Sequence, residues 1–188
     1  MRIQNSLFSS FKNKPRNKGF TLIEVLIAFI VLTIGLLGTV ALQTSAKQAS
    51  YDANQRSAAL ALANDIVERI RANDTADIVA NYSKTFSYLD TPVEKNCLNT
   101  QCSSSNIAEY DLFQWLKALR VADNTGSLAN GTVCIMPSLD GKGVNLRVVV
   151  AWQGRQKISE TTNKDIKCGT VSNRRTVVLD SYVFMRSA

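Results

Sequence analysis

The chain has four cysteines and no histidine, and these two facts limit the chemistry that it can perform. Without histidine, His-based acid–base catalysis, Ser-His and Cys-His nucleophiles and histidine metal ligands are all excluded. An even number of cysteines favours disulfide bonds where a domain is exported. The four are Cys97, Cys102, Cys134 and Cys168.

One carboxylate stands out by its surroundings, because Glu24 is the only ionisable residue in an apolar run from Phe20 to about Leu42. As a helix this run would span roughly 35 Å, enough to cross a hydrocarbon core of about 30 Å. A charged residue at the centre of a bilayer costs about 2.5 kcal/mol or more, so Glu24 is expected to have a partner. The alternative is that Glu24 lies at the interface and reaches water.

The net charge of +7 is concentrated before this run. Without the first 19 residues the chain keeps 17 basic and 15 acidic residues, so the basicity belongs to a leader and not to a binding face. Basic residues before an apolar run predict that the leader stays in the cytoplasm while the rest is exported. An ordinary secretory signal is cleaved after its apolar stretch, whereas here Gly19 precedes it. Cleavage at Gly19 would leave the apolar helix on the mature protein.

The segment Lys18-Gly19-Phe20-Thr21-Leu22-Ile23-Glu24 resembles the type III (prepilin) signal of type IV pilins and type II secretion pseudopilins. The resemblance implies that a prepilin peptidase removes residues 1–19 by cutting after Gly19. It also implies that the same enzyme N-methylates Phe20. Glu24 would then pair with the N-terminal amine of Phe20 on a neighbouring subunit during filament assembly.

Beyond Leu42 the pattern becomes amphipathic, which predicts that the helix continues outside the membrane. No proline lies between Pro15 and Pro92, so we expect one stem helix over residues 20–72, of which 20–42 span the membrane. A stripe of apolar residues at helical spacing is expected to face the rest of the protein. Its members are Ala46, Ala49, Ala53, Leu60, Ala63, Val67 and Ile70.

Residues 73–188 are predicted to form a small globular head. Alternating or β-branched residues predict strands at Val144–Trp152 and Thr176–Phe184, with a shorter one at Gly131–Met136 that Pro137 closes. The apolar spacing of Tyr110–Arg120 predicts a helix. The expected class is α+β, a pilin-like fold in which a long N-terminal helix packs against a small antiparallel sheet.

A second resemblance covers the head. Cys97 and Cys102 enclose a short loop, and the helix that follows carries Asp111-Leu112 and Trp115. With the later strand that ends at Trp152, this looks like the PilV-type minor pilins, the type IV pilus modification proteins.

The four cysteines allow three pairings, and we favour Cys97–Cys102 and Cys134–Cys168, the second of which would join the sheet to the loop after Trp152. The larger loop should contribute about 3–4 kcal/mol of stability. A zinc site with four cysteine ligands is the rival, but the usual short C-x2-C knuckles are missing. We expect no cofactor and no metal.

The resemblances imply a minor pilin that primes or enters a type IV pilus and supports twitching motility, adhesion or DNA uptake. Its partners would be the prepilin peptidase, the major pilin and other minor pilins, the pilus assembly platform and the inner membrane. It would cross the inner membrane of a Gram-negative bacterium once, with its head in the periplasm, before reaching the pilus. The alternatives are a type II secretion pseudopilin and a DNA-binding competence pilin.

A DNA-binding face would use basic residues of the later half of the chain, although acidic residues are interspersed and few aromatic residues are available for base stacking. A solvated surface is the competing interpretation. A membrane-anchored enzyme has no supporting motif, since Asp65 and Glu68 fit a solvated stem and no phosphate loop is present. The basic residues are Arg147, Arg155, Lys157, Lys164, Lys167, Arg174 and Arg175.

Overall fold

The computed structural model describes residues 19–91, 93–97, 99–155, 166–170 and 172–186. The predicted leader lies outside the described residues except for Gly19. The described residues form two compact units, the first ending at Ala46 and the second beginning at Lys47.

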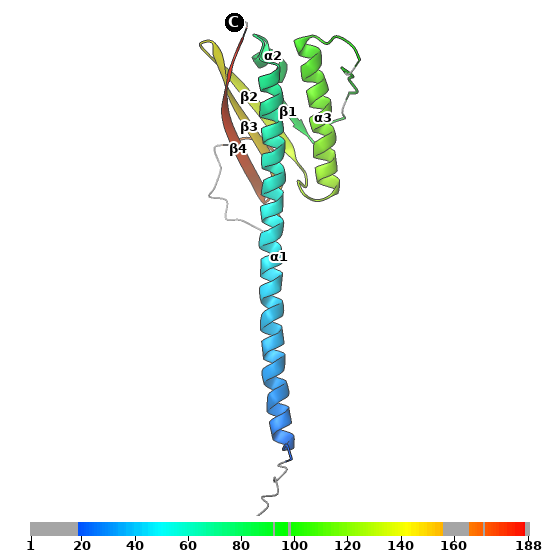
Figure 1. The fold of residues 1–188 in the computed structure, drawn as a ribbon, viewed down its shortest axis with the longest axis vertical. Helices are drawn as coiled ribbons and strands as arrows, with labels where there is room; N and C mark the ends of the chain where they lie inside the picture. Colours follow the sequence, from blue (N-terminus) through cyan, green and yellow to red (C-terminus); the bar gives the residue numbers. More distant parts are fainter. Residues whose placement is uncertain (1–18, 92, 98, 156–165, 171, 187–188) are drawn as a thin grey trace, which may run out of the picture. The chain divides into compact units, whose positions relative to one another are not determined.

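One helix dominates the N-terminal unit. Helix α1 runs from Leu22 to Ala72 and confirms the expected stem helix (Figure 1). In the first unit its threonines bond to their own helix, and Thr33, for example, donates to the carbonyl of Ile30 at 2.9 Å. Internal bonds of this kind leave few polar groups for a surrounding apolar phase to accommodate. Among the described residues α1 is the helix long and apolar enough to cross a membrane, with a mean hydropathy of 2.7 in its most apolar stretch.

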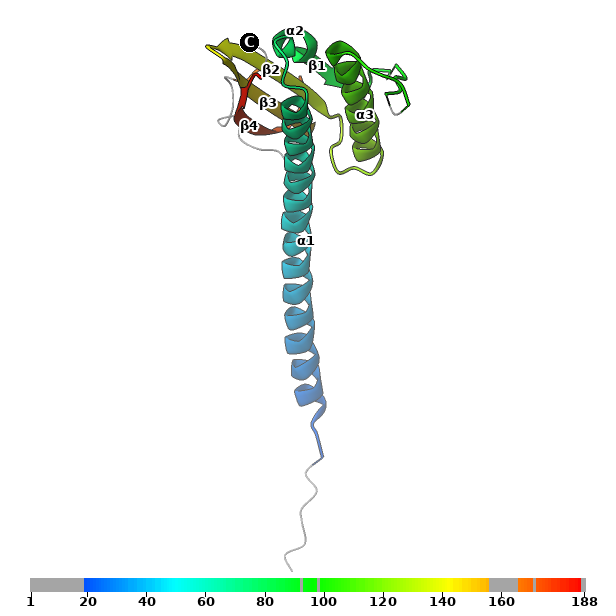
Figure 2. The ribbon, with the colours of Figure 1, turned by 45° about the horizontal axis from the view of Figure 1, so that its top comes forward.

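The second unit contains the C-terminal part of α1 and a small α+β head (Figures 1 and 2). Four strands form one antiparallel sheet in the order β1-β2-β3-β4. The α+β class and the packing of a small sheet against the helix therefore agree with the prediction. The remaining elements are α2 (Ile78–Tyr82), β1 (Lys84–Ser87), α3 (Ser104–Asn124), β2 (Thr132–Asp140), β3 (Gly143–Gln153) and β4 (Arg174–Phe184).

The hairpin between β2 and β3 follows directly from its turn residues. Asp140 pairs with Gly143, so only Gly141 and Lys142 lie in the loop. Gly141 has a φ of +60°, a conformation that glycine adopts without strain and that is typical of the first position of a tight hairpin turn. This two-residue turn is the connection that fixes the register of the two strands.

The prediction that Pro137 closes the third strand is wrong, because β2 continues to Asp140. Strand β1 pairs with β2 only as far as Ile135, so Pro137 lies where β2 has become an edge of the sheet. Two short elements, α2 and β1, were not predicted, since a five-residue helix and a four-residue strand are too short for a periodic pattern to emerge.

Helix α3 is longer than the predicted Tyr110–Arg120, because it begins at Ser104 and ends at Asn124. Its start is fixed by Ser103, whose hydroxyl accepts a hydrogen bond from the backbone N–H of Asn106 at 3.3 Å. A serine at this position satisfies one of the unpaired donors of the first turn.

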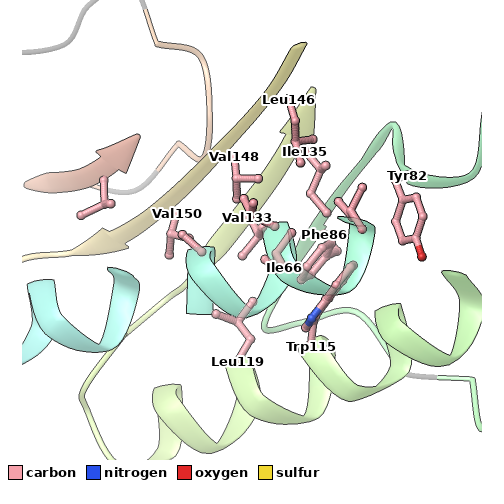
Figure 3. Packing of buried hydrophobic residues seen from close by; sticks show 14 of the residues in the cluster. Ile66, Tyr82, Phe86, Trp115, Leu119, Val133, Ile135, Leu146, Val148 and Val150 are labelled. Atoms are coloured by element: carbon pink, nitrogen blue, oxygen red, sulfur yellow. The ribbon is translucent and has the colours of Figure 1, made fainter. Parts of the chain in front are cut away.

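The head has a single main core built from α1, α3 and the inner face of the sheet (Figure 3). In Figure 3 Ile66 of α1, Trp115 of α3 and Phe86 of β1 point toward one another. The rings of Phe86 and Trp115 are stacked, with centroids 6.4 Å apart. Large aromatic side chains of this kind contribute much of the apolar area that stabilises a small domain.

The predicted stem stripe is only partly correct. Ala63, Val67 and Ile70 are buried as expected, whereas Ala53 and Leu60 are exposed. The buried face begins at Gln55, because the head covers α1 only from there. A polar residue at the start of the buried face was not anticipated from the hydrophobic pattern.

Candidate functional site

The first candidate site is the beginning of α1. Gly19, Phe20 and Thr21 precede the helix, and the Phe20 side chain is 82% exposed. The Thr21 hydroxyl accepts a hydrogen bond from the backbone N–H of Glu24 at 3.3 Å. Thr21 therefore caps the helix, which starts at the next residue. The peptide bond between Gly19 and Phe20 thus lies in non-helical backbone, shortly before the residue at which the capped helix begins.

Glu24 has a second feature that the sequence analysis overlooked. Threonine followed three residues later by glutamate is the pattern of a capping box, in which the glutamate assists the cap. Within the described part of the chain the Glu24 carboxylate forms no ion pair, and the residue is exposed. The Thr21-x-x-Glu24 spacing could have revealed the helix start from sequence.

The surface of α1 in the first unit is mainly apolar, and Glu24 is its one ionisable residue. Every described residue of this unit is exposed in the isolated chain. Burial of apolar surface is the main favourable term in association, and an apolar area this large needs a lipid or protein environment. Its large apolar side chains include Leu22, Val25, Phe29, Leu32, Leu36, Leu37 and Val40.

The second candidate site is the head with its two disulfides. Cys97 bonds to Cys102, with Cα atoms 5.8 Å apart, and closes the loop just before α3. The Sγ atom of Cys97 also lies 3.7 Å from the carbonyl oxygen of Asn106. An ion pair of 2.9 Å between Lys95 and Glu109 further ties this loop to α3.

The other disulfide joins Cys134 of β2 to Cys168, with Cα atoms 6.0 Å apart. Both cysteines are almost fully buried, and they pack with Val149 and Ala151 on the face of the sheet opposite the main core. Both bonds correspond to the pairing favoured from the sequence. All four cysteines are therefore disulfide-bonded, and none offers the thiolate that a zinc site requires.

A buried polar contact fixes the head to the stem. The Trp152 Nε1–H donates to Oε1 of Gln55 at 3.3 Å, and the Gln55 side-chain amide donates to the carbonyl of Gly126 at 3.2 Å. Gln55 thus provides a hydrogen-bond partner both for the Trp152 indole of β3 and for a backbone carbonyl in the loop after α3. Buried polar groups with complete hydrogen bonding favour a unique arrangement over alternatives.

A second polar cluster lies around Asp111 on α3, which is 3% exposed. The Tyr82 hydroxyl donates to Oδ2 of Asp111 at 2.9 Å, and Arg69 of the stem donates to Oδ1 at 3.3 Å. Burial raises the pKa of Asp111 above its usual range, while the hydrogen bonds from Tyr82 and Arg69 oppose this shift. Burial likewise raises the pKa of Tyr82, which keeps this hydroxyl a hydrogen-bond donor.

Asn73 extends this cluster at the end of α1. Its side-chain amide donates to the Tyr82 hydroxyl and to the carbonyl of Ser104, both at 2.9 Å. The indole of Trp115 donates to Asp65 at 2.9 Å, and Asp65 also accepts from Arg69 at 2.9 Å. Asp65 is thus a structural partner of α3, although the sequence pattern had suggested only a solvated position on the stem.

The basic residues considered for DNA binding do not form one free cationic face among the described positions. Arg147 pairs with Asp180 at 2.7 Å, and the Arg155 guanidinium lies 4.5 Å from the centroid of the Tyr51 ring. The other arginines also have partners, while Lys157 and Lys164 lie outside the described residues. Arg174 donates to the carbonyls of Cys168 and Gly169, and Arg175 lies 3.6 Å from Asp52.

Two family models match the chain. Residues 14–40 match the prokaryotic N-terminal methylation motif, and residues 41–113 match the type IV pilin Tt1218-like family. The first range contains Gly19, Phe20 and Glu24, and the second contains the rest of the stem, Cys97, Cys102 and the start of α3. No curated protein and no solved structure matches the chain significantly.

Each of the two matched ranges, residues 14–40 and residues 41–113, agrees with the structure that it covers. The methylation motif coincides with the capped start of a mainly apolar helix, and the pilin match continues along α1 into an α+β head. Pilins of this family are structural proteins and not enzymes, and an apolar N-terminal helix with this motif fits a membrane-anchored subunit. The chain is a type IV pilin-like protein.

Proposed function

We propose that the chain is a minor pilin, which primes assembly of a type IV pilus or is incorporated into it. The observation that carries this proposal is the methylation motif placed directly on the start of α1. A structure with this start and a disulfide-bearing head suits a subunit whose helix packs inside a filament while its head faces outward. The pilus would serve twitching motility, adhesion or DNA uptake.

The proposed processing follows from the N-terminal geometry. Prepilin peptidase would hydrolyse the peptide bond between Gly19 and Phe20, and the new amine of Phe20 would be methylated. Thr21 would still cap α1 after cleavage, because its hydrogen bond involves only residues on the retained side. The Glu24 carboxylate would then form an ion pair with the N-terminal amine of a neighbouring subunit. This pair would neutralise the charge of Glu24 in an apolar environment.

The proposed location follows from charge and hydropathy. Before assembly α1 would cross the inner membrane once, with the head in the periplasm of a Gram-negative cell. Two disulfides suit that oxidising compartment. After assembly the head would lie on the pilus at the cell surface.

A type II secretion pseudopilin would share the N-terminal motif, so only the head can distinguish it from a minor pilin. The small disulfide loop of Cys97 and Cys102 ahead of α3, with Asp111 and Trp115 in that helix, favours the minor pilin because it resembles the type IV pilus modification proteins. The proposed partners are the prepilin peptidase, the major pilin, other minor pilins and the assembly platform. DNA is a weaker candidate partner because the arginines considered for such a face, Arg147, Arg155, Arg174 and Arg175, already have partners within the chain.

The test is the intact mass and N-terminal sequence of the protein extracted from membranes of its host. A methylated Phe20 as first residue, with the protein recovered in sheared pili, would support the proposal. A start at Met1 in a host with active prepilin peptidase would refute it. A processed chain found only with secretion components would identify a pseudopilin instead.

A further inference from the structure

The two edges of the head sheet are built differently. The β1 edge is four residues long and begins with Lys84, and short edge strands that carry lysine are a common protection against pairing with other chains. The opposite edge is β4, which has eleven residues. From Thr176 to Phe184 this strand contains no lysine and no proline, and its one charge, Asp180, is paired with Arg147.

The register shows which backbone groups of β4 face outward. Gly154 donates to the carbonyl of Asn173, and Met185 donates to the carbonyl of Lys142, so the odd-numbered residues of β4 bond to β3. The even-numbered residues therefore direct their N–H and C=O groups toward the open edge. In the described part of the chain, the open-edge groups of Val178, Asp180, Tyr182 and Phe184 have no backbone partner.

The same residues carry an exposed apolar surface. Their side chains lie on the face of the sheet opposite the main core, where Tyr182 is 47% and Phe184 is 61% exposed. Met136 of β2 is also exposed on that face. An additional β-strand can bind to such an edge, because an extended backbone presents its N–H and C=O groups at the same spacing as the unpaired groups of β4. The exposed aromatic side chains beside these groups can contact side chains of the added strand.

A second copy of this chain is a poor occupant of the edge. Ion pairs join Arg175 to Asp52 and Arg186 to Asp74, so β4 runs in the same direction as α1 within the head. Pairing of two identical β4 edges about a two-fold axis is antiparallel and would reverse one stem relative to the other. Subunits that follow one another in a filament share one orientation of their heads, so two copies cannot pair in this way within it.

We infer that the open edge of β4, from Val178 to Phe184, receives an extended segment of a different filament protein as a fifth strand. This inference rests on the proposed function and specifies how the head contacts another subunit. On the aromatic face the incoming strand carries apolar residues opposite Val178 and Tyr182, because cross-strand apolar pairs stabilise a sheet. On its other face it carries polar residues, since Arg71 of the stem donates there to Ser181 at 2.7 Å.

The test uses the full-length chain in its own host. A photoreactive phenylalanine analogue is placed at Phe184, and in a control strain at Thr85 on the protected β1 edge. We expect an adduct from position 184, formed with one segment of another filament protein, and none from position 85. Equal adducts from both positions, no adduct from position 184, or an adduct with a second copy would overturn the inference.

Backbone pairing is separated from mere proximity by two variants at one residue. Val178→Pro removes an N–H that faces the open edge and leaves the bonds to β3 intact, whereas Val178→Ala removes only side-chain atoms. We expect the proline variant to reduce the adduct by about 2- to 10-fold relative to alanine, as for one lost backbone hydrogen bond. Equal adduct yields would contradict strand addition.

Two checks keep the outcomes distinct. If Val178→Pro lowers the melting temperature strongly, Val178→Lys replaces it, because a lysine on an edge hinders pairing while it keeps the N–H. The N-terminus and pilus recovery of the same preparations are measured first. A chain that is not processed or not in pili refutes the proposed function, whereas a chain in pili without the position-184 adduct refutes only the strand addition.

Discussion

The indole of Trp152 donates a hydrogen bond of 3.3 Å to the side chain of Gln55, although the two residues are 97 positions apart. Gln55 lies on the stem helix and Trp152 near the end of β3, so this contact fixes where the head begins to cover α1. Both residues are buried, which makes the bond sensitive to substitution.

Replacing Gln55 by alanine should destabilise the head by about 1–3 kcal/mol, because Trp152 Nε1 and the Gly126 carbonyl would both lose a buried partner. The free energy of unfolding from a denaturant titration of the detergent-solubilised chain measures this. Asn54→Ala, at an exposed position one residue earlier, is the matched control and should change stability by less than about 0.5 kcal/mol. Equal effects of the two variants would contradict the proposed anchoring.

The two disulfides should differ in their contribution to stability. Cys134 and Cys168 are separated by 34 positions and Cys97 and Cys102 by 5. In the chain-entropy model, the double serine variant of the first pair loses about 3–4 kcal/mol and that of the second about 2 kcal/mol. Thermal unfolding of both variants under the same conditions provides the comparison. A larger loss from the short loop would show that its role is not mainly entropic.

Asp111 should make stability fall as the pH rises. Burial raises its folded-state pKa above the unfolded value, so its contribution is fully present below the unfolded pKa and is lost as pH rises through the folded pKa. We therefore expect the free energy of unfolding of the wild type to fall relative to that of Asp111→Asn as the pH rises. The fall begins near the unfolded pKa of about 4 and is complete above the folded pKa of Asp111. Unfolding free energies of both proteins across pH give the difference.

The control for this titration is Glu109→Gln on the same helix, an exposed carboxylate that pairs with Lys95. With this control substitution, the free energy of unfolding should still fall with rising pH as it does in the wild type. If Asp111→Asn and wild type differ by a constant amount at every pH, the titration of Asp111 does not control stability.

Two substitutions at Glu24 can separate charge from helix capping. Glutamine is compatible with the capping pattern that begins at Thr21 but has no charge, whereas alanine removes both. If Glu24 pairs with an N-terminal amine during assembly, both variants should be exported and cleaved but absent from sheared pili. Immunoblots of membrane and pilus fractions give the result. Normal incorporation of Glu24→Gln would assign Glu24 to capping alone.

The features that depend on local pattern could be predicted from the amino acids alone. A continuous apolar run, followed by an amphipathic pattern without proline, predicted α1, because helix formation depends on neighbouring residues in the chain. Alternating residues likewise predicted a strand at Val144–Trp152, and β3 extends only one residue further at each end. The prepilin motif is also local, since a peptidase reads a short segment.

The way in which distant segments meet became visible in the folded chain and could not be predicted from local pattern. Lys84–Ser87 carries too little pattern to predict a strand, and it becomes one because Phe86 packs against Trp115 and the backbone pairs with β2. Gln55 and Asp111 look like surface residues in sequence and are buried because their hydrogen-bond partners come from elements far along the chain. The open edge of β4 depends on sheet order, which neighbouring residues cannot specify because strand pairing is non-local.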